Sequence, residues 1–169
     1  LKIGIYLGSP PGSGGMFQYG IAVLDALATL KNIHHINAAY EDIGWKPYLD
    51  ARGIAGRHLD HGKGLGWCWG RLCLPLWLWN AGVWRLDKRA QFFARSGMDY
   101  WMFPGQDHWT YLSRQPAIGV VHDLMHRYES QFPEVSSCGR YWLREYRFKH
   151  LCRAARIILV DSEVGKRQV

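Results

Sequence analysis

The order of the apolar runs along this chain constrains its fold more than any other feature. Residues Lys2–Leu7 are strand formers, and a glycine- and proline-rich stretch at 8–15 follows them directly. In 16–30, apolar residues recur at helical spacing around most of the circumference, which is typical of a helix buried against a sheet. His35–Tyr40 is a second strand pattern. Strand, loop, helix and strand together predict a βαβ unit with a right-handed crossover.

The second half of the chain repeats this alternation. Strand patterns occur at 98–103, Ala117–Val121 and 156–160. A helix is expected at about 139–155, and another is expected to begin at Val164. Apolar strands that alternate with helices indicate a parallel sheet that is covered on both faces.

The length of 169 residues suits one compact domain. We therefore expect a single α/β domain over residues 1–169, a Rossmann-like three-layer sandwich with a mostly parallel central sheet. A tryptophan-rich insert around 63–90 interrupts the pattern. The first residue is not Met and the last residues run on in helical style, so we expect the chain to be part of a longer protein.

The loop after the first strand is the first candidate binding site. A loop that leaves a strand and opens a helix presents unbonded backbone N–H groups and the positive end of the helix dipole, and both favour a phosphate oxygen. Gly14 and Gly15 would let a ligand approach the backbone closely. Phe17 stands where a dinucleotide-binding fingerprint needs its third glycine, and Met16 stands where a P-loop needs lysine. The alternative is a tight turn without a ligand.

Two polar pairs follow the ends of later strands. His122 and Asp123 come directly after one strand, and Ser162 and Glu163 follow the last one. Ligands of open α/β sheets bind at the carboxyl ends of strands, so His122 and Asp123 are candidate catalytic residues. Ser162 and Glu163 are candidates for the substrate-facing edge. The alternatives are a histidine that caps its strand and a plain N-cap for the last helix.

Tryptophan is unusually frequent, with nine residues in the chain, and several lie in the insert together with cations. This composition is typical of a segment in a membrane interface, so Trp77 and Trp79 are candidates for contact with a membrane or an acceptor. A helical hairpin packed on the sheet is an equal alternative, and Pro75 argues against one uninterrupted helix. The cations at 140–156 are expected to line a solvated helix face.

Several classes of protein lack their signals here. The four cysteines form no C-x-x-C pair and no histidine cluster has zinc spacing, so no metal site is expected. No apolar run of about 20 residues is present. A net charge of +7 fits an anionic partner without identifying it. No helix-turn-helix or RNP-type motif points to nucleic acid.

Three segments, taken in order, resemble the N-terminal domain of the family-4 retaining glycosyltransferases. Gly-Ser-Gly-Gly-Met at 12–16 resembles the glycine loop of that family. The strand at 118–124, which ends in His-Asp-Leu, is similar to its His-Asp strand, and Phe-Pro-Glu at 132–134 is similar to the loop that follows. The stretch 153–166 is similar to its element of strand, Ser-Glu and helix. These segments bracket almost the whole chain.

The resemblance implies a GT-B enzyme, with two Rossmann-like domains and the active site in the cleft between them. The N-terminal domain of such an enzyme mainly binds the acceptor. A C-terminal domain, absent from this chain, holds the nucleotide-sugar and supplies paired glutamates. The resemblance puts Gly14 and Gly15 near the donor diphosphate, His122 near the transferred sugar, and Ser162 and Glu163 at the cleft edge.

The implied reaction moves a hexose from a nucleotide-sugar to a glycan or lipid-linked acceptor with retention, and it needs no metal or other cofactor. Its physical work is to stabilise charge on the leaving phosphate and to position two substrates in a water-poor cleft. Expected partners are the donor, the acceptor, the protein's own C-terminal domain and an anionic membrane surface, with no nucleic acid. We expect a role in cell-envelope polysaccharide synthesis, at a cytoplasmic location either free or peripheral on the inner face of the membrane. The chain alone is expected to have no transferase activity.

Two rival functions stay open at this stage. One is a basic, tryptophan-rich α/β module that binds nucleic acid or protein partners and catalyses nothing, which predicts salt-sensitive binding to oligonucleotides. The other is part of a nucleotide-dependent oxidoreductase, in which Glu41 or Asp42 after the second strand would hold a ribose.

Overall fold

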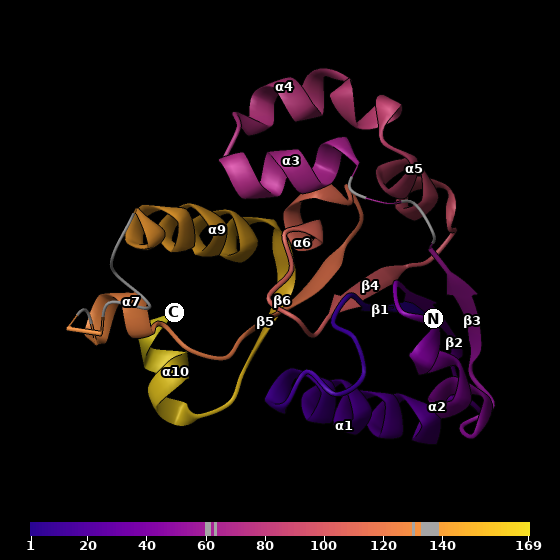
Figure 1. Ribbon diagram of the computed structural model, residues 1–169. Coiled ribbons are helices and arrows are strands. Elements are labelled where there is room, and N and C mark those ends of the chain that lie inside the picture. The colour runs from indigo at the N-terminus through magenta and orange to yellow at the C-terminus, as the bar shows by residue number, and fades with distance from the viewer. Residues whose placement is uncertain (60–61, 63, 130, 133–138) are drawn as a thin grey trace.

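The centre of the protein is a six-stranded sheet in which all neighbouring strands are parallel, in the order β3-β2-β1-β4-β5-β6 (Figure 1). The computed structural model describes residues 1–59, 62, 64–129, 131–132 and 139–169. The strands are β1 (Lys2–Leu7), β2 (His35–Tyr40), β3 (Ala55–His58), β4 (Tyr100–Phe103), β5 (Ala117–Val121) and β6 (Ala155–Val160). The expected Rossmann-like fold is confirmed, and the sheet is wholly parallel rather than mostly so.

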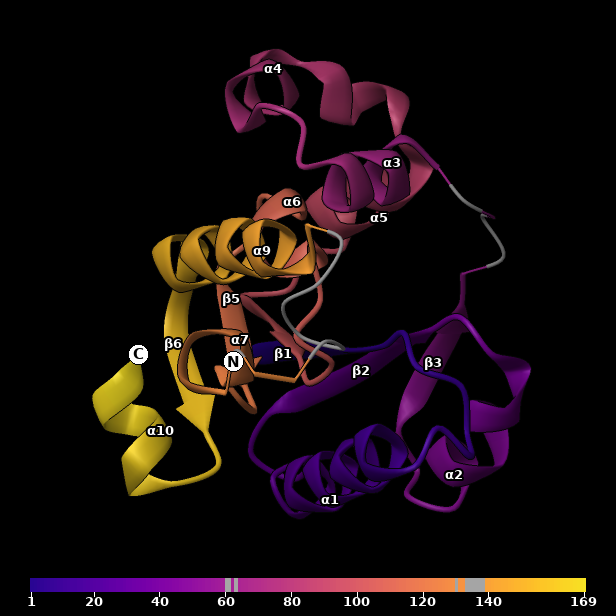
Figure 2. The same ribbon diagram turned by 60° about the vertical axis from the view of Figure 1, so that its left-hand side comes forward.

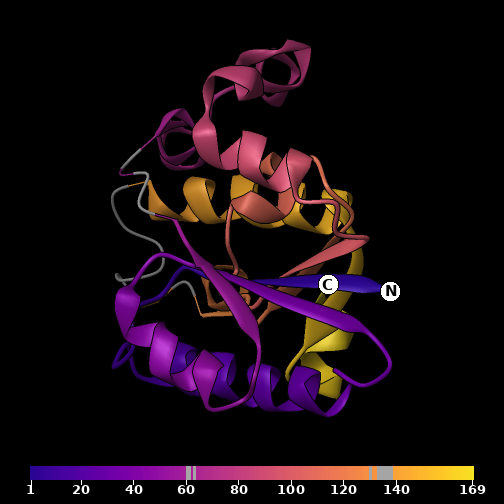
Figure 3. The same cartoon turned by 90° about the vertical axis from the view of Figure 1, so that its right-hand side faces the viewer.

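Helices cover both faces of the sheet and complete three layers, as the view in Figure 3 shows. One layer contains α1 (Gly15–Thr29), α2 (Lys46–Asp50) and α10 (Glu163–Gln168). The opposite layer contains α3 (Leu65–Leu72), α5 (Lys88–Arg95), α6 (Trp109–Leu112) and α9 (Arg140–Ala154), with α4 (Leu76–Ala81) outside it. The described residues also form the short helices η1 (Ile43–Trp45), η2 (Val83–Leu86) and α7 (Met125–Tyr128).

Alternation along β1 divides the core into two clusters. Ile3, Ile5 and Leu7 belong to the cluster that contains Leu24 and other residues of α1, whereas Tyr6 belongs to the cluster on the other face. Gly4 also faces that side, where a Cβ would lie 2.6 Å from the Trp101 ring. The first strand therefore needs glycine at this position for the indole to pack flat against the backbone.

The strands and helices that were predicted begin and end within two residues of their predicted bounds, but β3 and the short helices between β2 and β4 and around β5 were not given bounds from the sequence. The four residues of β3 are all exposed, and they include Arg57 and His58, so the strand carries no apolar alternation. It pairs along one side only, with β2. Of the segments that carry the family resemblance, Pro133 and Glu134 lie outside the described residues.

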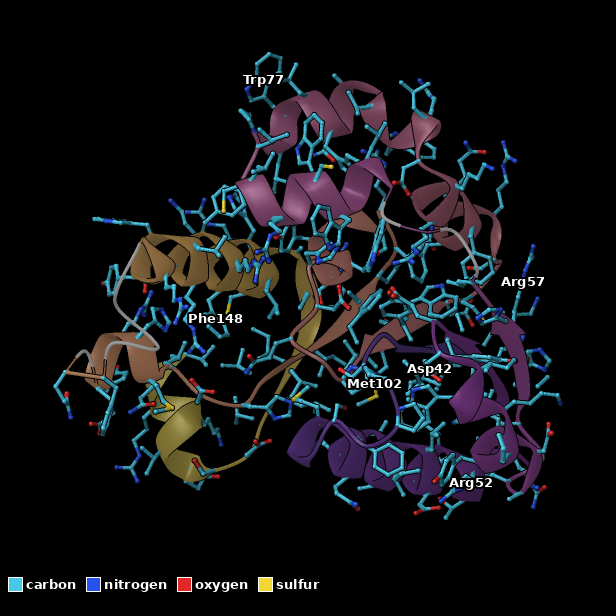
Figure 4. All side chains as sticks on the ribbon, in the orientation of Figure 1. Asp42, Arg52, Arg57, Trp77, Met102 and Phe148 are labelled. Carbon is cyan, nitrogen blue, oxygen red and sulfur yellow. The ribbon has the colours of Figure 1, made fainter. Side chains whose placement is uncertain are left out.

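The tryptophan-rich insert forms the helical hairpin of α3 and α4, and Pro75 is the N-cap of the second helix. Trp79 is completely buried, and its indole Nε1 donates a hydrogen bond to the Leu112 carbonyl at 2.9 Å. The expectation that Trp79 contacts a membrane or an acceptor is therefore wrong, because its side chain is packed against α6 and is not exposed. Trp77 is 69% exposed and points away from the fold (Figure 4). None of the described helices is both long and apolar enough to cross a bilayer.

Candidate functional site

The candidate site lies at the carboxyl ends of the strands, where the strand order reverses. The chain runs from β1 to β2 and β3 on one side of the sheet and returns to β4 on the other side of β1. Such a switch point opens a crevice between the loops that leave the two central strands. A Cβ on Gly105, after β4, would lie 3.7 Å from Met16 Cε and 3.9 Å from Ser9 Oγ. The loops that follow β1 and β4 therefore meet at this crevice.

His122 is held from three directions at this edge. Its Nδ1 lies 2.8 Å from Asp161 Oδ2, and its Nε2 lies 2.9 Å from the Pro104 carbonyl oxygen. The Tyr19 ring meets the imidazole edge-on, with centroids 4.6 Å apart. Both partners present acceptor oxygens, toward which a histidine ring donates from a nitrogen that carries a proton. The ends of β4, β5 and β6 and the first turns of α1 thus converge on one imidazole ring.

The glycine loop presents open backbone to the same edge. Gly14 has a φ of +66°, which only glycine adopts without strain, and a Cβ on Gly14 or Gly15 would meet nothing within 4 Å. Within the described part of the chain, no side chain caps the start of α1, and its first turn contains no acid. The leading N–H groups and the positive end of this 15-residue helix are therefore available to an anion.

The other predicted site residues have local structural roles. Asp123 Oδ1 accepts a hydrogen bond from the Met125 backbone N–H at 3.1 Å and lies 3.2 Å from Arg144 Nη1, so this carboxylate fixes the loop after β5. Ser162 is the N-cap of α10 and accepts a hydrogen bond from Gly165 N at 3.0 Å. Glu163 is exposed and lies 3.8 Å from Lys166.

Only some of the predicted site residues line a common cavity. A cavity of about 190 Å³ is lined by His122, Asp123 and Ser162, together with residues of α7 and α10. Glu163 and the two glycines of the loop do not line it. The structure therefore brings His122, Asp123 and Ser162 together at this cavity. The glycine loop lies outside it, and Tyr19 of α1 contacts the His122 ring.

Tyr19 and the Pro104 carbonyl were not singled out in the sequence. The tyrosine lies within an apolar helical stripe, where it is indistinguishable from a core residue. A backbone carbonyl carries no sequence signal at all. The only available signal was position, because Pro104 directly follows a predicted strand and Tyr19 lies one turn after the glycine loop.

Behind the site, the buried His126 forms a cluster with two charged residues. Glu145 accepts hydrogen bonds from His126 Nε2 at 2.8 Å and from both Arg127 Nη2, at 2.8 Å, and Arg127 Nε. The Arg127 guanidinium, with help from His126, lowers the pKa of Glu145 to about 2. Burial lowers the pKa of His126. This cluster joins α7 to α9 beneath the loop that carries His122.

The cluster predicts a loss of stability in acid. Glu145 has a folded pKa below its ordinary 4.5, so its contribution is present above pH 4.5 and is lost as pH falls toward about 2. His126 has a folded pKa below its ordinary 6.5, so protonation of the unfolded chain lowers stability as pH falls below 6.5. Denaturant titrations between pH 7 and 3 should show Glu145→Gln less stable at pH 7 by about 1–2 kcal/mol, allowing for solvent screening.

The same titrations should show a smaller loss for Glu145→Gln than for the wild type below pH 4.5. Glu163→Gln is the matched control, because that carboxylate is exposed. It should follow the wild-type curve throughout. Equal slopes for the wild type and Glu145→Gln between pH 5 and 3 would contradict the role of the cluster.

Both candidates for the acid that an oxidoreductase would use to hold a ribose make hydrogen bonds within the chain. Glu41 accepts hydrogen bonds from Tyr6 Oη and Arg89 Nη1. Asp42 Oδ1 accepts a hydrogen bond from Gly44 N at 2.8 Å. Glu41 already accepts from two side chains and Asp42 fixes its own loop, so the arrangement does not favour that function.

Among the described residues, no three His, Cys, Asp or Glu side chains are placed to hold a metal ion. No protein-family model matches this chain, and no curated protein sequence is similar to it. What the geometry establishes is a Rossmann-like α/β domain whose switch-point edge carries a hydrogen-bonded histidine beside an open helix N-terminus.

Proposed function

We propose that this chain is the acceptor-side, N-terminal domain of a GT-B glycosyltransferase. Such an enzyme moves a hexose from a nucleotide-sugar to a glycan or lipid-linked acceptor with retention. The observation that carries the proposal is His122, which Asp161 and the Pro104 carbonyl hold at the switch-point edge beside α1. A firmly held histidine next to an open helix N-terminus suits a reaction in which negative charge grows on a leaving diphosphate.

Each group in the site would have a distinct role. The N–H groups after Gly14 and Gly15, together with the helix dipole, would attract the diphosphate of the donor. His122 would direct its Nε2–H toward a hydroxyl of the transferred sugar, which requires that bond to be exchanged for the one to Pro104. Asp161 would keep the ring oriented while this exchange takes place. A second domain would supply the remaining contacts to the nucleotide-sugar.

The surface of the helical insert supports a peripheral location on an anionic membrane as part of this proposal. Leu72, Trp77 and Leu86 are 66%, 69% and 74% exposed. Arg85 lies over the Trp84 ring at 5.4 Å, so cations accompany the exposed apolar side chains. Apolar residues with neighbouring cations suit the boundary between headgroups and acyl chains.

Binding of a nucleoside diphosphate to the purified protein tests the phosphate part of the proposal. Gly15→Asp places a carboxylate on the first turn of α1, where a Cβ has open space, so the fold is expected to tolerate it. Its negative charge should weaken binding of UDP or GDP at least tenfold, because the carboxylate repels the diphosphate and offsets the positive potential of the helix N-terminus. Phosphorus-31 NMR titration of the diphosphate signals measures this effect.

Gly15→Asn is the matched control, since it has nearly the same shape without the charge. It should bind within about threefold of the wild type, while Gly15→Asp loses binding. Equal broadening of the diphosphate signals by all three proteins, or by none, would refute a phosphate site at this loop.

A further inference from the structure

A second cavity, separate from the one at His122, lies between α9 and the segment that follows β4. Its volume is about 120 Å³, and its lining residues are Gln106, Tyr111, Arg144, Arg147, Phe148 and Leu151. Helices α6 and α9 pack on the same face of the sheet in Figures 1 and 2, and Phe148 points from α9 toward the sheet (Figure 4). The apolar side chains form one part of the lining, and the four polar side chains form the rest.

Two of the polar lining groups are buried without a partner among the described residues. Tyr111 is only 8% exposed, and its hydroxyl makes no hydrogen bond there. The Gln106 Nε2 atom is also buried and unpartnered. Buried polar groups in native proteins are nearly always satisfied, so two unsatisfied donors at one cavity indicate a missing acceptor. Burial raises the pKa of Tyr111, which keeps its hydroxyl protonated and able to donate.

The two arginines give the cavity a positive charge. The cations of α9 were expected to line a solvated face, but Arg144 and Arg147 are partly buried and face this cavity. Arg144 is paired with Asp123 at 3.2 Å. Arg147 donates from Nε and Nη2 to the Gly70 carbonyl, both at 3.2 Å, and pairs with none of the described carboxylates. Asp123 therefore pairs with one of the two guanidinium groups, and Asp107, whose charge acts on Tyr111, does not line the cavity.

The nearest acid on α9 does not restore the balance. Glu145 lies between the two arginines in sequence, but His126 and Arg127 engage its carboxylate away from the cavity. A water molecule in the cavity would satisfy hydrogen bonds without neutralising this charge. A cation would meet only donors and positive groups. An acceptor that also carries negative charge satisfies both requirements.

We propose that this cavity binds a single oxyanion, a phosphate or carboxylate group, through Tyr111, Gln106 and the guanidinium groups of Arg144 and Arg147. A volume of about 120 Å³ corresponds to roughly four water molecules, which suits one such group and excludes a nucleotide. Arg144 bonds to Asp123, which directly follows His122 in the chain, so the bound group lies behind the candidate site. That this anion belongs to the sugar acceptor rests on the proposed function, whereas the binding itself does not.

Calorimetric titration of the purified protein with inorganic phosphate, and separately with acetate, tests the proposal at constant ionic strength in chloride. Saturable binding is expected. Tyr111→Phe removes only the hydroxyl and should weaken binding about tenfold, as loss of a hydrogen bond to a charged group does. Arg147→Gln should weaken it further. Lys149→Gln is the control, because this exposed cation lies on the same helix and should leave affinity unchanged.

The outcomes separate the possibilities. Absence of saturable binding means that the cavity holds water only, and equal affinity for Tyr111→Phe and Lys149→Gln means that phosphate binds elsewhere; both overturn the proposal. If Arg147→Gln unfolds through loss of its bonds to Gly70, Tyr111→Phe still decides, because its hydroxyl has no described partner to lose. The stronger of the two ligands identifies a phosphate or a carboxylate.

Repeating the phosphate titration with the Gly15→Asp protein distinguishes binding in this cavity from binding at the glycine loop. Binding that survives Gly15→Asp and is lost in Tyr111→Phe supports the cavity even if the glycosyltransferase proposal fails. Binding that is lost in Gly15→Asp and retained in Tyr111→Phe assigns the phosphate to the glycine loop and overturns the cavity.

Discussion

Replacing Trp79 by alanine is expected to lower the free energy of unfolding by about 3–5 kcal/mol, whereas the same change at Trp77 should alter it by no more than about 0.5 kcal/mol. Trp79 is completely buried, contacts the Trp69 ring at 5.5 Å between centroids, and bonds to the Leu112 carbonyl. Its removal leaves a cavity between the insert and α6 and an acceptor without its donor. Trp77 is mostly exposed and leaves neither.

Chemical denaturation of the three proteins, followed by far-ultraviolet circular dichroism, measures the difference between the two variants. Flotation with anionic liposomes then tests the surface role of the insert, and only Trp77→Ala is informative there, because Trp79→Ala disturbs the fold. Reduced flotation of a stable Trp77→Ala protein supports membrane contact. A Trp79→Ala variant as stable as Trp77→Ala would refute the buried role assigned to this indole.

The insert shows how far composition can be interpreted. A break at Pro75 was visible in the sequence, and the hairpin alternative followed from it. Which tryptophan is buried was not visible, because the two residues lie in the same short apolar segment. The difference depends on Leu112, 33 residues away, whose carbonyl receives the indole N–H of Trp79. Local sequence contains no information about such a partner.

The strands also differ in how far the sequence predicts them. β1 and β5 each have a neighbouring strand on both sides and are largely buried, so they consist almost entirely of apolar residues and were predictable. β3 is an edge strand whose side chains are all exposed, so the hydrophobic effect left no pattern in it. Its place in the sheet depends on backbone pairing with β2, which any residues other than proline can make.

The position of the candidate site followed from topology, and its geometry did not. A histidine directly after a buried parallel strand must lie at the carboxyl edge, so His122 was predictable as an edge residue. Its partner Asp161 was known only as part of a helix-capping segment. The pair forms because β5 and β6 are neighbours, which sets the two residues 39 positions apart in sequence against each other.

Replacing His122 by alanine is expected to lower sugar transfer by about 100- to 1000-fold, the usual cost of losing a group that stabilises developing charge. The rate must be measured on the chain joined to the second domain that the proposed function requires, with a labelled nucleotide-sugar and an acceptor fraction. His35→Ala is the matched control, because that exposed histidine lies at the opposite, amino end of β2 and should leave the rate unchanged.

Asp161→Asn separates charge from position at the same site. The amide keeps a hydrogen-bond partner beside Nδ1 but removes the negative charge of the carboxylate, so we expect an intermediate loss of about tenfold. A rate for His122→Ala within threefold of the wild type would remove the histidine from the reaction. A rate for Asp161→Asn equal to that of the wild type would show that the charge of this carboxylate does not support the histidine.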